Sequence, residues 1–315
     1  MQYRALGDSD LRVSEICLGT WTTFGESVGD DVAATLVDTA FEVGINFFDT
    51  SDNYGVPAGR AEEALGRALA GRPRESYIVA TKVGGELPNG DRGLARVRVL
   101  ERIDGSLVRL GLDHVDLYQC HRYDDDVPLE ETLGALTEVV EAGKARFIGV
   151  SNWQGDQIRR AVQLARKHGF AKIVSSQPQY SLLRRDPEQD VIPASRENGI
   201  SQIPWSPLAQ GVLTGKYRPG KSFAVETRAA ARGEGFMSQY LGEEVLARVE
   251  RLRPIADGLG ITMAQLALAW LLHEPNVASP IVGASRPEQV RANAASSGVE
   301  LDETALNAIE AVLAR

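Results

Sequence analysis

The chain has 315 residues, and its 34 Lys and Arg against 43 Asp and Glu give a formal net charge of −9 at pH 7. This acidic balance disfavours a general nucleic-acid binder, which needs net or patterned positive charge. Hydrophobic residues make up 43% and charged residues 24%, a composition typical of a globular protein and not of a disordered chain.

The sequence also lacks the marks of a metal cluster, a leader or a membrane span. Cys17 and Cys120 each lie in an apolar run, and two such cysteines make neither a disulfide framework nor a zinc cluster, so we expect no metal site. The first residues contain no apolar core of a signal peptide. No stretch reaches the roughly 18 apolar residues of a transmembrane helix. We therefore expect a cytoplasmic protein that binds neither membranes nor nucleic acid.

The dominant pattern along the chain is a short apolar run, a turn and then an amphipathic helical stretch. The predicted strands are Glu15–Leu18, Asn46–Phe48, Tyr77–Ala80, His114–Gln119, Phe147–Val150, Ile173–Ser176, Ser201–Ile203 and Pro280–Val282. The predicted helices are Asp31–Val43, Ala61–Ala70, Ala95–Leu110, Leu129–Ala142, Gln154–His168, Pro187–Asn198, Met263–His273 and Pro287–Ser297, most of which a glycine follows.

Repeated strand–helix units indicate a parallel sheet with crossover helices. Eight units are the number that closes a (β/α)8 TIM barrel, and an open doubly wound sheet is the alternative. We expect one domain over residues 1–315.

Four segments lie outside the repeat. Tyr3–Leu6 and Asp10–Val13 flank Gly7-Asp8 and predict an N-terminal β-hairpin that would plug one end of the barrel. Leu208–Met237 has little periodicity and predicts a long loop, which is usually functional. Ser238–Leu259 predicts an extra helix and Asp302–Ala314 a closing one.

In a TIM barrel the active site lies at the carboxyl ends of the strands, so the residues that follow each run are informative. These residues are Asp49, Thr81, Lys82, His121, Ser151, Asn152, Gln177, Trp205, Ser206 and Gly283–Arg286.

An acid, a lysine and a histidine on this rim, with Tyr54 close behind Asp49, fit the reduction of a carbonyl group. The carbonyl oxygen gains negative charge and needs a proton, which the phenol of Tyr54 can supply. Lys82 would lower the phenol pKa from its ordinary value of about 10, and Asp49 would keep Lys82 charged. His121 would donate a hydrogen bond to the carbonyl oxygen.

The motifs that carry these residues resemble those of the aldo-keto reductases, in the expected order and over essentially the full length. FDTSDNYG at 48–55 resembles the family signature FDTAxxYG, ATK at 80–82 matches its lysine strand, DLYQCH at 116–121 resembles DLYxxH, and GVSNW at 149–153 matches GVSN. WSPL at 205–208 and GVLTGKY at 211–217 resemble the branch that includes bacterial reductases and potassium-channel β subunits.

The resemblance implies a (β/α)8 barrel that reduces a small aldehyde or ketone with NADPH or NADH. It makes Asp49, Tyr54, Lys82 and His121 the catalytic residues, with Tyr54 as general acid and His121 orienting the carbonyl. Ser151, Asn152 and Gln177 would hold the cofactor's carboxamide, and Trp205 would stack on the nicotinamide. The remaining expected cofactor residues are Gly19, Thr20, Trp21, Asp49, Ser206, Pro207, Leu208, Gly211, Lys216, Arg228, Gly283, Ser285, Arg286, Gln289 and Asn293.

Trp21, Tyr54, His121 and Arg122 are the expected substrate residues. Arg122 would bind an acidic substrate, or else pair with Asp124–Asp126.

The sequence departs from its relatives where the adenosine phosphate would bind. Gly283 stands where many relatives have lysine, and Ala292 where many have glutamate. Arg286 would supply a planar phosphate partner instead, or else is an exposed arginine at a helix start. We expect NADPH to be favoured over NADH.

Other interpretations have weaker support. Gly215–Ser222 fits the P-loop pattern but lacks a clear strand before it and a helix after it. No GxGxxG follows a strand, as a Rossmann dehydrogenase requires. A Schiff-base aldolase with Lys82 as nucleophile is disfavoured because Asp49 would keep that amine protonated. A cofactor-sensing partner subunit with little turnover stays open, since the branch with channel subunits keeps the same four residues.

Overall fold

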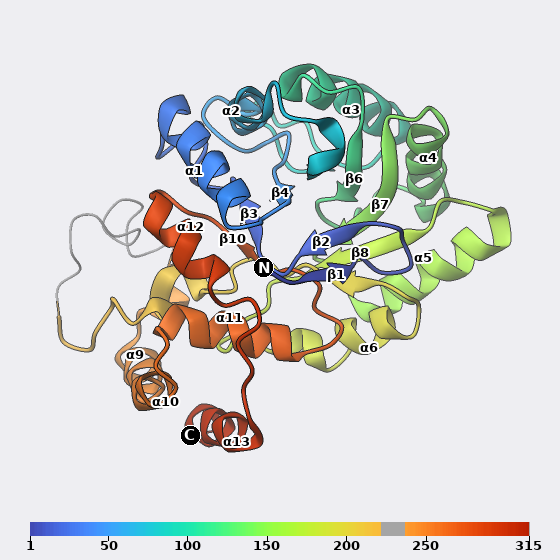
Figure 1. Cartoon of the computed structure of the whole chain (residues 1–315). Coiled ribbons are helices and arrows are strands. Elements are labelled where there is room, and N and C mark those ends of the chain that lie inside the picture. Colours follow the sequence, from blue (N-terminus) through green and yellow to red (C-terminus); the bar gives the residue numbers. More distant parts are fainter. Residues whose placement is uncertain (222–236, 315) are drawn as a thin grey trace.

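Eight parallel strands form one curved sheet in the order β10-β3-β4-β5-β6-β7-β8-β9 (Figure 1). The strands are β3 (Cys17–Gly19), β4 (Phe47–Asp49), β5 (Ile78–Val83), β6 (Val115–Cys120), β7 (Ala145–Ser151), β8 (Ile173–Gln177), β9 (Ser201–Gln202) and β10 (Ile281–Val282). The computed structural model describes residues 1–221 and 237–314. The (β/α)8 prediction is confirmed, and the open doubly wound sheet is not observed.

Helices connect the strands and cover the outside of the sheet (Figure 1). They are α1 (Asp30–Glu42), α2 (Arg60–Leu69), α3 (Arg96–Leu110), α4 (Leu129–Glu141), α5 (Gly155–His168), α6 (Val191–Arg196), α11 (Met263–His273) and α12 (Pro287–Ala294), followed by α13 (Glu303–Leu313). Short 3-10 helices occupy η1 (Arg74–Ser76) and η3 (Ala209–Thr214). Gly111 and Gly169 end α3 and α5 in the left-handed conformation that glycine adopts readily.

Two predicted helices are broken in the structure. The segment Ser238–Leu259, predicted as one helix, forms η4 (Ser238–Tyr240), α9 (Glu243–Glu250) and α10 (Arg253–Gly258). Gly242 starts α9, and Pro254 lies in the first turn of α10, where proline is tolerated but cannot continue an earlier helix. The predicted helix Pro187–Asn198 divides into η2 (Asp186–Glu188) and α6.

The N-terminal hairpin closes the amino end of the barrel, as expected. Strands β1 (Tyr3–Ala5) and β2 (Arg12–Ser14) pair antiparallel and cross the barrel (Figure 1). Leu6, Leu11 and Val13 are buried in one apolar cluster with interior strand residues such as Phe47 and Leu117. The opposite end therefore remains for ligands.

The barrel closes between β9 and β10 by isolated contacts. Every other neighbouring pair of strands forms a ladder of paired residues, whereas this junction has the single bridges Gln202–Val277 and Trp205–Ile281 in the described structure. The backbone N–H of Ile281 donates to the carbonyl of Pro204 at 2.9 Å. We refer to this junction as the β9–β10 seam.

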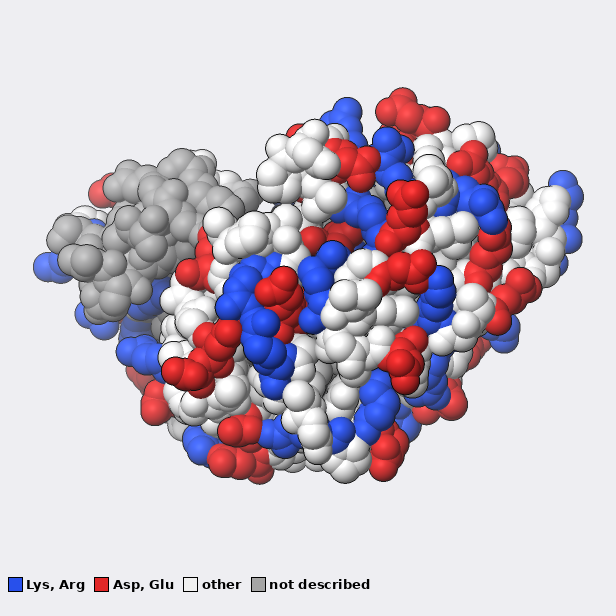
Figure 2. Space-filling model, turned by 90° about the horizontal axis from the view of Figure 1, so that it is seen from above, with Lys and Arg blue, Asp and Glu red and all other residues white. Residues whose placement is uncertain are grey.

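Basic and acidic side chains are interspersed on the face shown in Figure 2, which has no broad area of one sign. Ion pairs such as Arg60–Asp30 and Arg96–Glu138 place opposite charges together on the helices. Within the described ranges, no single helix is long and apolar enough to span a membrane. One pair, Glu243–Gly258 with Met263–His273, passes that test only when joined across an 87° bend.

Candidate active site

Three neighbouring strands, β4, β5 and β6, carry Asp49, Lys82 and His121 at or just after their carboxyl ends. Side chains alternate between the two faces of a strand, and Phe47 and Ala80, two residues before Asp49 and Lys82, belong to the barrel interior. The register pairs Asp49 with Ala80 across β4 and β5. The period of two therefore carries three chemically different side chains to one end of the barrel.

A buried ion pair lies at the centre of the site. Nζ of Lys82 donates to Oδ2 of Asp49 at 2.6 Å and to the carbonyl of Thr50 at 2.7 Å, and the two side chains are 0% and 4% exposed. The second carboxylate oxygen of Asp49 accepts from Nε2 of Gln177 at 2.9 Å. Burial lowers the pKa of Lys82, but Asp49 and Tyr54 outweigh it, so this pKa lies above its ordinary value.

Tyr54 lies against both Lys82 and His121. The ammonium of Lys82 is 4.7 Å from the centre of the phenol ring, and the imidazole of His121 stands edge-on to that ring at 5.6 Å. Burial raises the pKa of Tyr54, and Lys82 opposes this effect without overcoming it. Lys82 does lower the pKa of Tyr54, as expected, but burial raises it by more. The net pKa therefore lies above its ordinary value, and the phenol keeps its proton at neutral pH.

His121 is neutral. Burial, followed by the positive charges of Lys82, Arg122 and Arg102, lowers its pKa to about 3. Its backbone N–H donates to the carbonyl of Val83, and its Nδ1 lies 3.2 Å from Oγ of Ser51.

A layer of buried charges beneath Tyr54 was missed in the sequence analysis. Nε of Arg102, on α3, lies 2.6 Å from Oδ2 of Asp52 in the loop that carries Tyr54. Nη2 of Arg102 also donates to the carbonyl of Gly85. Burial raises the pKa of Asp52 to about 7 against the opposing charge of Arg102. Arg102 thereby ties the loops after β4 and β5 to one helix, a relation that no local motif encodes.

Trp205 is fixed beside this centre. Its indole N–H donates to Oδ1 of Asn152 at 3.0 Å, and its rings stand edge-on to Trp21 at 5.9 Å. Nδ2 of Asn152 donates to Oγ of Ser151, whose hydroxyl donates to the carbonyl of Gln177. No described residue donates to Oε1 of Gln177, so this oxygen is free to accept from a ligand amide.

Strained backbone gathers on the same side of the barrel. Five residues other than glycine have positive φ in the described structure: Thr22, Asn152, Ser206, Ala209 and Gln210. All five follow the carboxyl ends of β3, β7 or β9. Such conformations cost about 1–3 kcal/mol each and cluster where a ligand is held. Sequence reasoning missed Thr22, Ala209 and Gln210 because positive φ in these residue types leaves no local signal.

The remaining predicted cofactor residues lie along this rim. Gly19 ends β3 and Thr20 follows it; Pro207 and Leu208 precede η3, which contains Gly211, and Lys216 comes after it; Gly283, Ser285 and Arg286 follow β10; Gln289 and Asn293 lie on α12. Ser285 donates its backbone N–H to Oε1 of Gln289, closing the turn into α12. Arg286 is exposed at the start of α12 and forms no ion pair with a described residue. Arg228 lies outside the described residues.

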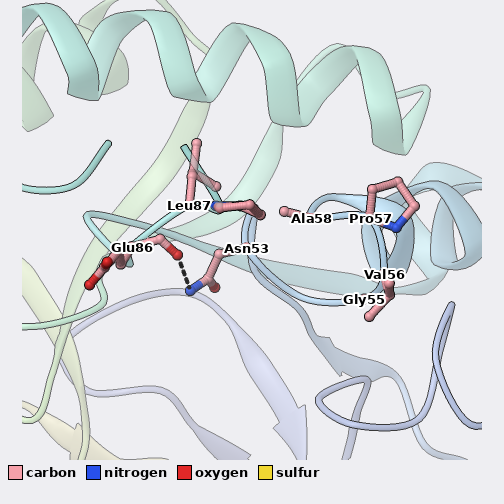
Figure 3. A pocket seen from close by; sticks show the side chains of 8 residues that line it. Asn53, Gly55, Val56, Pro57, Ala58, Glu86 and Leu87 are labelled. Atoms are coloured by element: carbon pink, nitrogen blue, oxygen red, sulfur yellow. Dashed lines mark hydrogen bonds between the residues drawn. The ribbon is translucent and has the colours of Figure 1, made fainter. Parts of the chain in front are cut away.

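An open hollow of about 400 Å³ adjoins the Tyr54 loop (Figure 3). Val56, Pro57, Leu87 and Pro88 give it apolar walls. Asn53 lies at its edge and donates to the carbonyl of Glu86 at 3.4 Å, the dashed line in Figure 3.

Arg122 is exposed directly after His121, and no carboxylate of the described residues pairs with it. The carboxylate of Asp124 instead accepts from the backbone N–H groups of Leu94 and Asp126. The alternative in which Arg122 pairs with Asp124–Asp126 is therefore not observed.

The part of the chain that the structure describes has neither the arrangement of a P-loop nor a metal cluster. Gly215 follows the 3-10 helix η3, whereas a P-loop lysine is preceded by a strand and opens a helix. Lys221 lies in no helix, and Ser222 is outside the described residues. In residues 1–221 and 237–314, no group of three His, Cys, Asp or Glu side chains is arranged to hold a metal ion.

The site thus combines a buried Asp–Lys pair, a tyrosine and a neutral histidine at one end of a TIM barrel. The model of the aldo/keto reductase family matches residues 15–314. The chain belongs to the aldo/keto reductase family. It is 40% identical over 298 residues to a protein of Oryza sativa subsp. japonica named "Probable voltage-gated potassium channel subunit beta", covering 93% of this chain and 90% of that protein. A protein of the same name from Arabidopsis thaliana is 39% identical with the same coverage.

Proposed function

We propose that the protein reduces aldehydes or ketones to alcohols with NADPH, and that Tyr54 donates the proton. The observation that carries this proposal is the buried Lys82–Asp49 pair beside a phenol that keeps its proton. The family membership supports the same class of reaction.

The charges of the site suit proton transfer from Tyr54. Two N–H groups of Lys82 are used by Asp49 and Thr50, which leaves the third for the phenol oxygen. As negative charge develops on the substrate oxygen, the phenol gives up its proton, and the nearby ammonium stabilises the phenolate. Asp49 keeps Lys82 charged throughout, and His121, being neutral, orients the carbonyl without adding charge.

The rim from β7 through β10 to β3 fits an extended dinucleotide. Trp205 offers a ring face whose orientation is fixed by the hydrogen bond from its indole N–H to Asn152. The free Oε1 of Gln177 suits a carboxamide. Strained residues at Ser206, Ala209 and Gln210 mark where backbone would approach the phosphates. A bound nicotinamide cofactor supplies the hydride. Arg286, exposed and unpaired among the described residues, supports a preference for NADPH over NADH.

The substrate is proposed to be a small carbonyl compound. Trp21, Tyr54 and His121 would surround the carbonyl, the hollow beside Asn53 would take an apolar substituent, and Arg122 would bind an acidic group if one is present.

The test follows absorbance at 340 nm with NADPH and NADH in parallel and a panel of aldehydes and ketones. We expect consumption that depends on the carbonyl and prefers NADPH. Tyr54→Phe should lose most turnover while fluorescence titration shows unchanged NADPH binding, because only the proton donor is removed. Tyr3→Phe is the matched control, since it removes a phenol at the other end of the barrel. Near-normal reduction by Tyr54→Phe would reject the role proposed for this residue.

A cofactor-sensing subunit is the second candidate, favoured by the names of the two plant relatives. Tight NADPH binding without carbonyl-dependent consumption across the panel would support it. If neither consumption nor binding occurs, a Schiff base at Lys82, trapped with borohydride, would be tested next.

A further inference from the structure

Ser51 lies within hydrogen-bond distance of His121, although the family signature has alanine at this position and the resemblance assigns Ser51 no role. Ser51 is fully buried two residues after Asp49. Its Oγ is 2.8 Å from Oδ1 of Asn53, 3.3 Å from Oδ1 of Asp52 and 3.2 Å from Nδ1 of His121. Gly85 permits this close arrangement, because a Cβ there would lie 2.8 Å from Nδ1 of His121.

The three neighbours compete for one hydroxyl proton. The amide of Asn53 is oriented by its Nδ2, which donates to the carbonyl of Glu86 (Figure 3). Its Oδ1 therefore faces Ser51 and only accepts. The contact between Oγ and Oδ1 of Asp52, at 3.3 Å, is longer than the contact with Asn53. The shortest contact gives the Ser51 proton to Asn53. Oγ then presents lone pairs to His121, and only a protonated Nδ1 can bond to them.

His121 has a single ring proton to place. Because the imidazole is neutral, protonation of Nδ1 leaves Nε2 with a lone pair. An unprotonated Nε2 cannot donate to a carbonyl oxygen, which itself carries only lone pairs.

We propose that Ser51 is a positioning residue that holds the proton of resting His121 on Nδ1 and leaves Nε2 unprotonated. The effect of this protonation state on carbonyl binding rests on the proposed reductase function. Before His121 can donate to a carbonyl, Nδ1 must release its proton to water and Nε2 must take one up, while the Ser51 hydroxyl turns from Asn53 toward Nδ1. The resting site therefore opposes the carbonyl-binding state by the free energy of this rearrangement.

The first experiment is a long-range ¹H–¹⁵N correlation spectrum of the ¹⁵N-histidine-labelled full chain at pH 7. The chain has four histidines, and loss of one signal set in His121→Gln assigns His121. We expect the pattern of a neutral ring protonated on Nδ1. Ser51→Ala should move the population toward the Nε2-protonated form, whereas Ser76→Ala, which removes a serine hydroxyl bonded to Pro73, should leave it unchanged.

A wild-type ring protonated on Nε2, or a tautomer unchanged in Ser51→Ala, would overturn the proposal. Neither measurement needs catalysis, so the proposal can fail or stand independently of the reductase function. If the protein is a reductase, Ser51→Ala should lower the KM for the carbonyl by about 2- to 10-fold, the factor expected from one neutral hydrogen bond. An unchanged or raised KM would reject the link between this tautomer and carbonyl binding.

Discussion

Replacing Lys82 with methionine tests the buried ion pair on which the candidate site is built. The substitution keeps the length of the side chain but removes the ammonium from Oδ2 of Asp49, 2.6 Å away, in a site where both side chains are almost fully buried. Breaking such a pair from one side typically costs about 3–5 kcal/mol, because the remaining charge is left without a partner.

The structure also sets an upper limit on the stability that Lys82→Met loses. Among the described residues, Asp49 retains only Gln177 and, at 3.5 Å, Gln119 as donors, so in the variant we expect it to become protonated on folding. Protonating a carboxyl of unfolded pKa about 3.9 at pH 7 costs about 4 kcal/mol, and at pH 5 about 1.5 kcal/mol. An acid whose pKa is raised by folding destabilises the protein increasingly as the pH rises above the unfolded pKa. The loss should therefore shrink as the pH falls.

Urea unfolding at pH 7 and pH 5, followed by tryptophan fluorescence, measures these values as differences from wild type at the same pH. We expect Lys82→Met to lose about 3–4 kcal/mol at pH 7 and about 2 kcal/mol less at pH 5. The double variant Asp49→Asn/Lys82→Met should recover part of the pH 7 loss, since no charge is left buried. An equal loss at both pH values, or a double variant less stable than Lys82→Met, would refute the reasoning.

Three further predictions use features of the same structure. Gly134→Ala in α4 should stabilise the protein by about 0.5–1 kcal/mol, because the added Cβ meets no atom nearer than 3.8 Å. Gly66→Ala in α2 should destabilise it by about 1–3 kcal/mol, because the added Cβ would lie 2.4 Å from the carbonyl oxygen of Leu110. Thermal unfolding of the two variants checks the sign of each effect. Between pH 7 and pH 5, the free energy of unfolding of His121→Gln should fall by about 2 kcal/mol less than that of wild type. In wild type, folding holds His121 neutral, and this contribution to stability is lost as the pH falls from the unfolded pKa of about 6.5 toward 3. Urea midpoints that decline equally in both proteins would contradict this prediction. Arg286→Ala should raise the KM for NADPH about tenfold, as a loss of 1.4 kcal/mol would, and equal effects on NADPH and NADH would reject a phosphate role.

Periodicity and motifs were sufficient to predict the barrel and the positions of Asp49, Lys82 and His121, because a strand repeats every two residues and parallel strands end at one edge. The break before Pro254, between α9 and α10, was missed because an amphipathic pattern continues across it. The net pKa direction of Tyr54 was missed because desolvation depends on what surrounds a group, which sequence neighbours do not report.

Long-range polar contacts were also beyond the motifs. Arg102 reaches the loop residue Asp52 from helix α3, and Ser51 meets His121 across two loops. The first pair depends on the packing of α3, and the second on the loops after β4 and β6 meeting at one end of the barrel. The proposed roles of the cofactor and substrate residues stay predictions until ligands are measured.

The β9–β10 seam has a consequence for how the free protein opens. The seam has two isolated bridges, whereas β5 and β6 share four paired residues, so the amide of Ile281 should exchange with solvent before those of β5 and β6. Trp205 and Gly283–Arg286 stand on opposite sides of that seam. A ligand that contacts both sides would hold the β9–β10 junction closed, and its binding free energy would include the free energy of keeping the barrel closed.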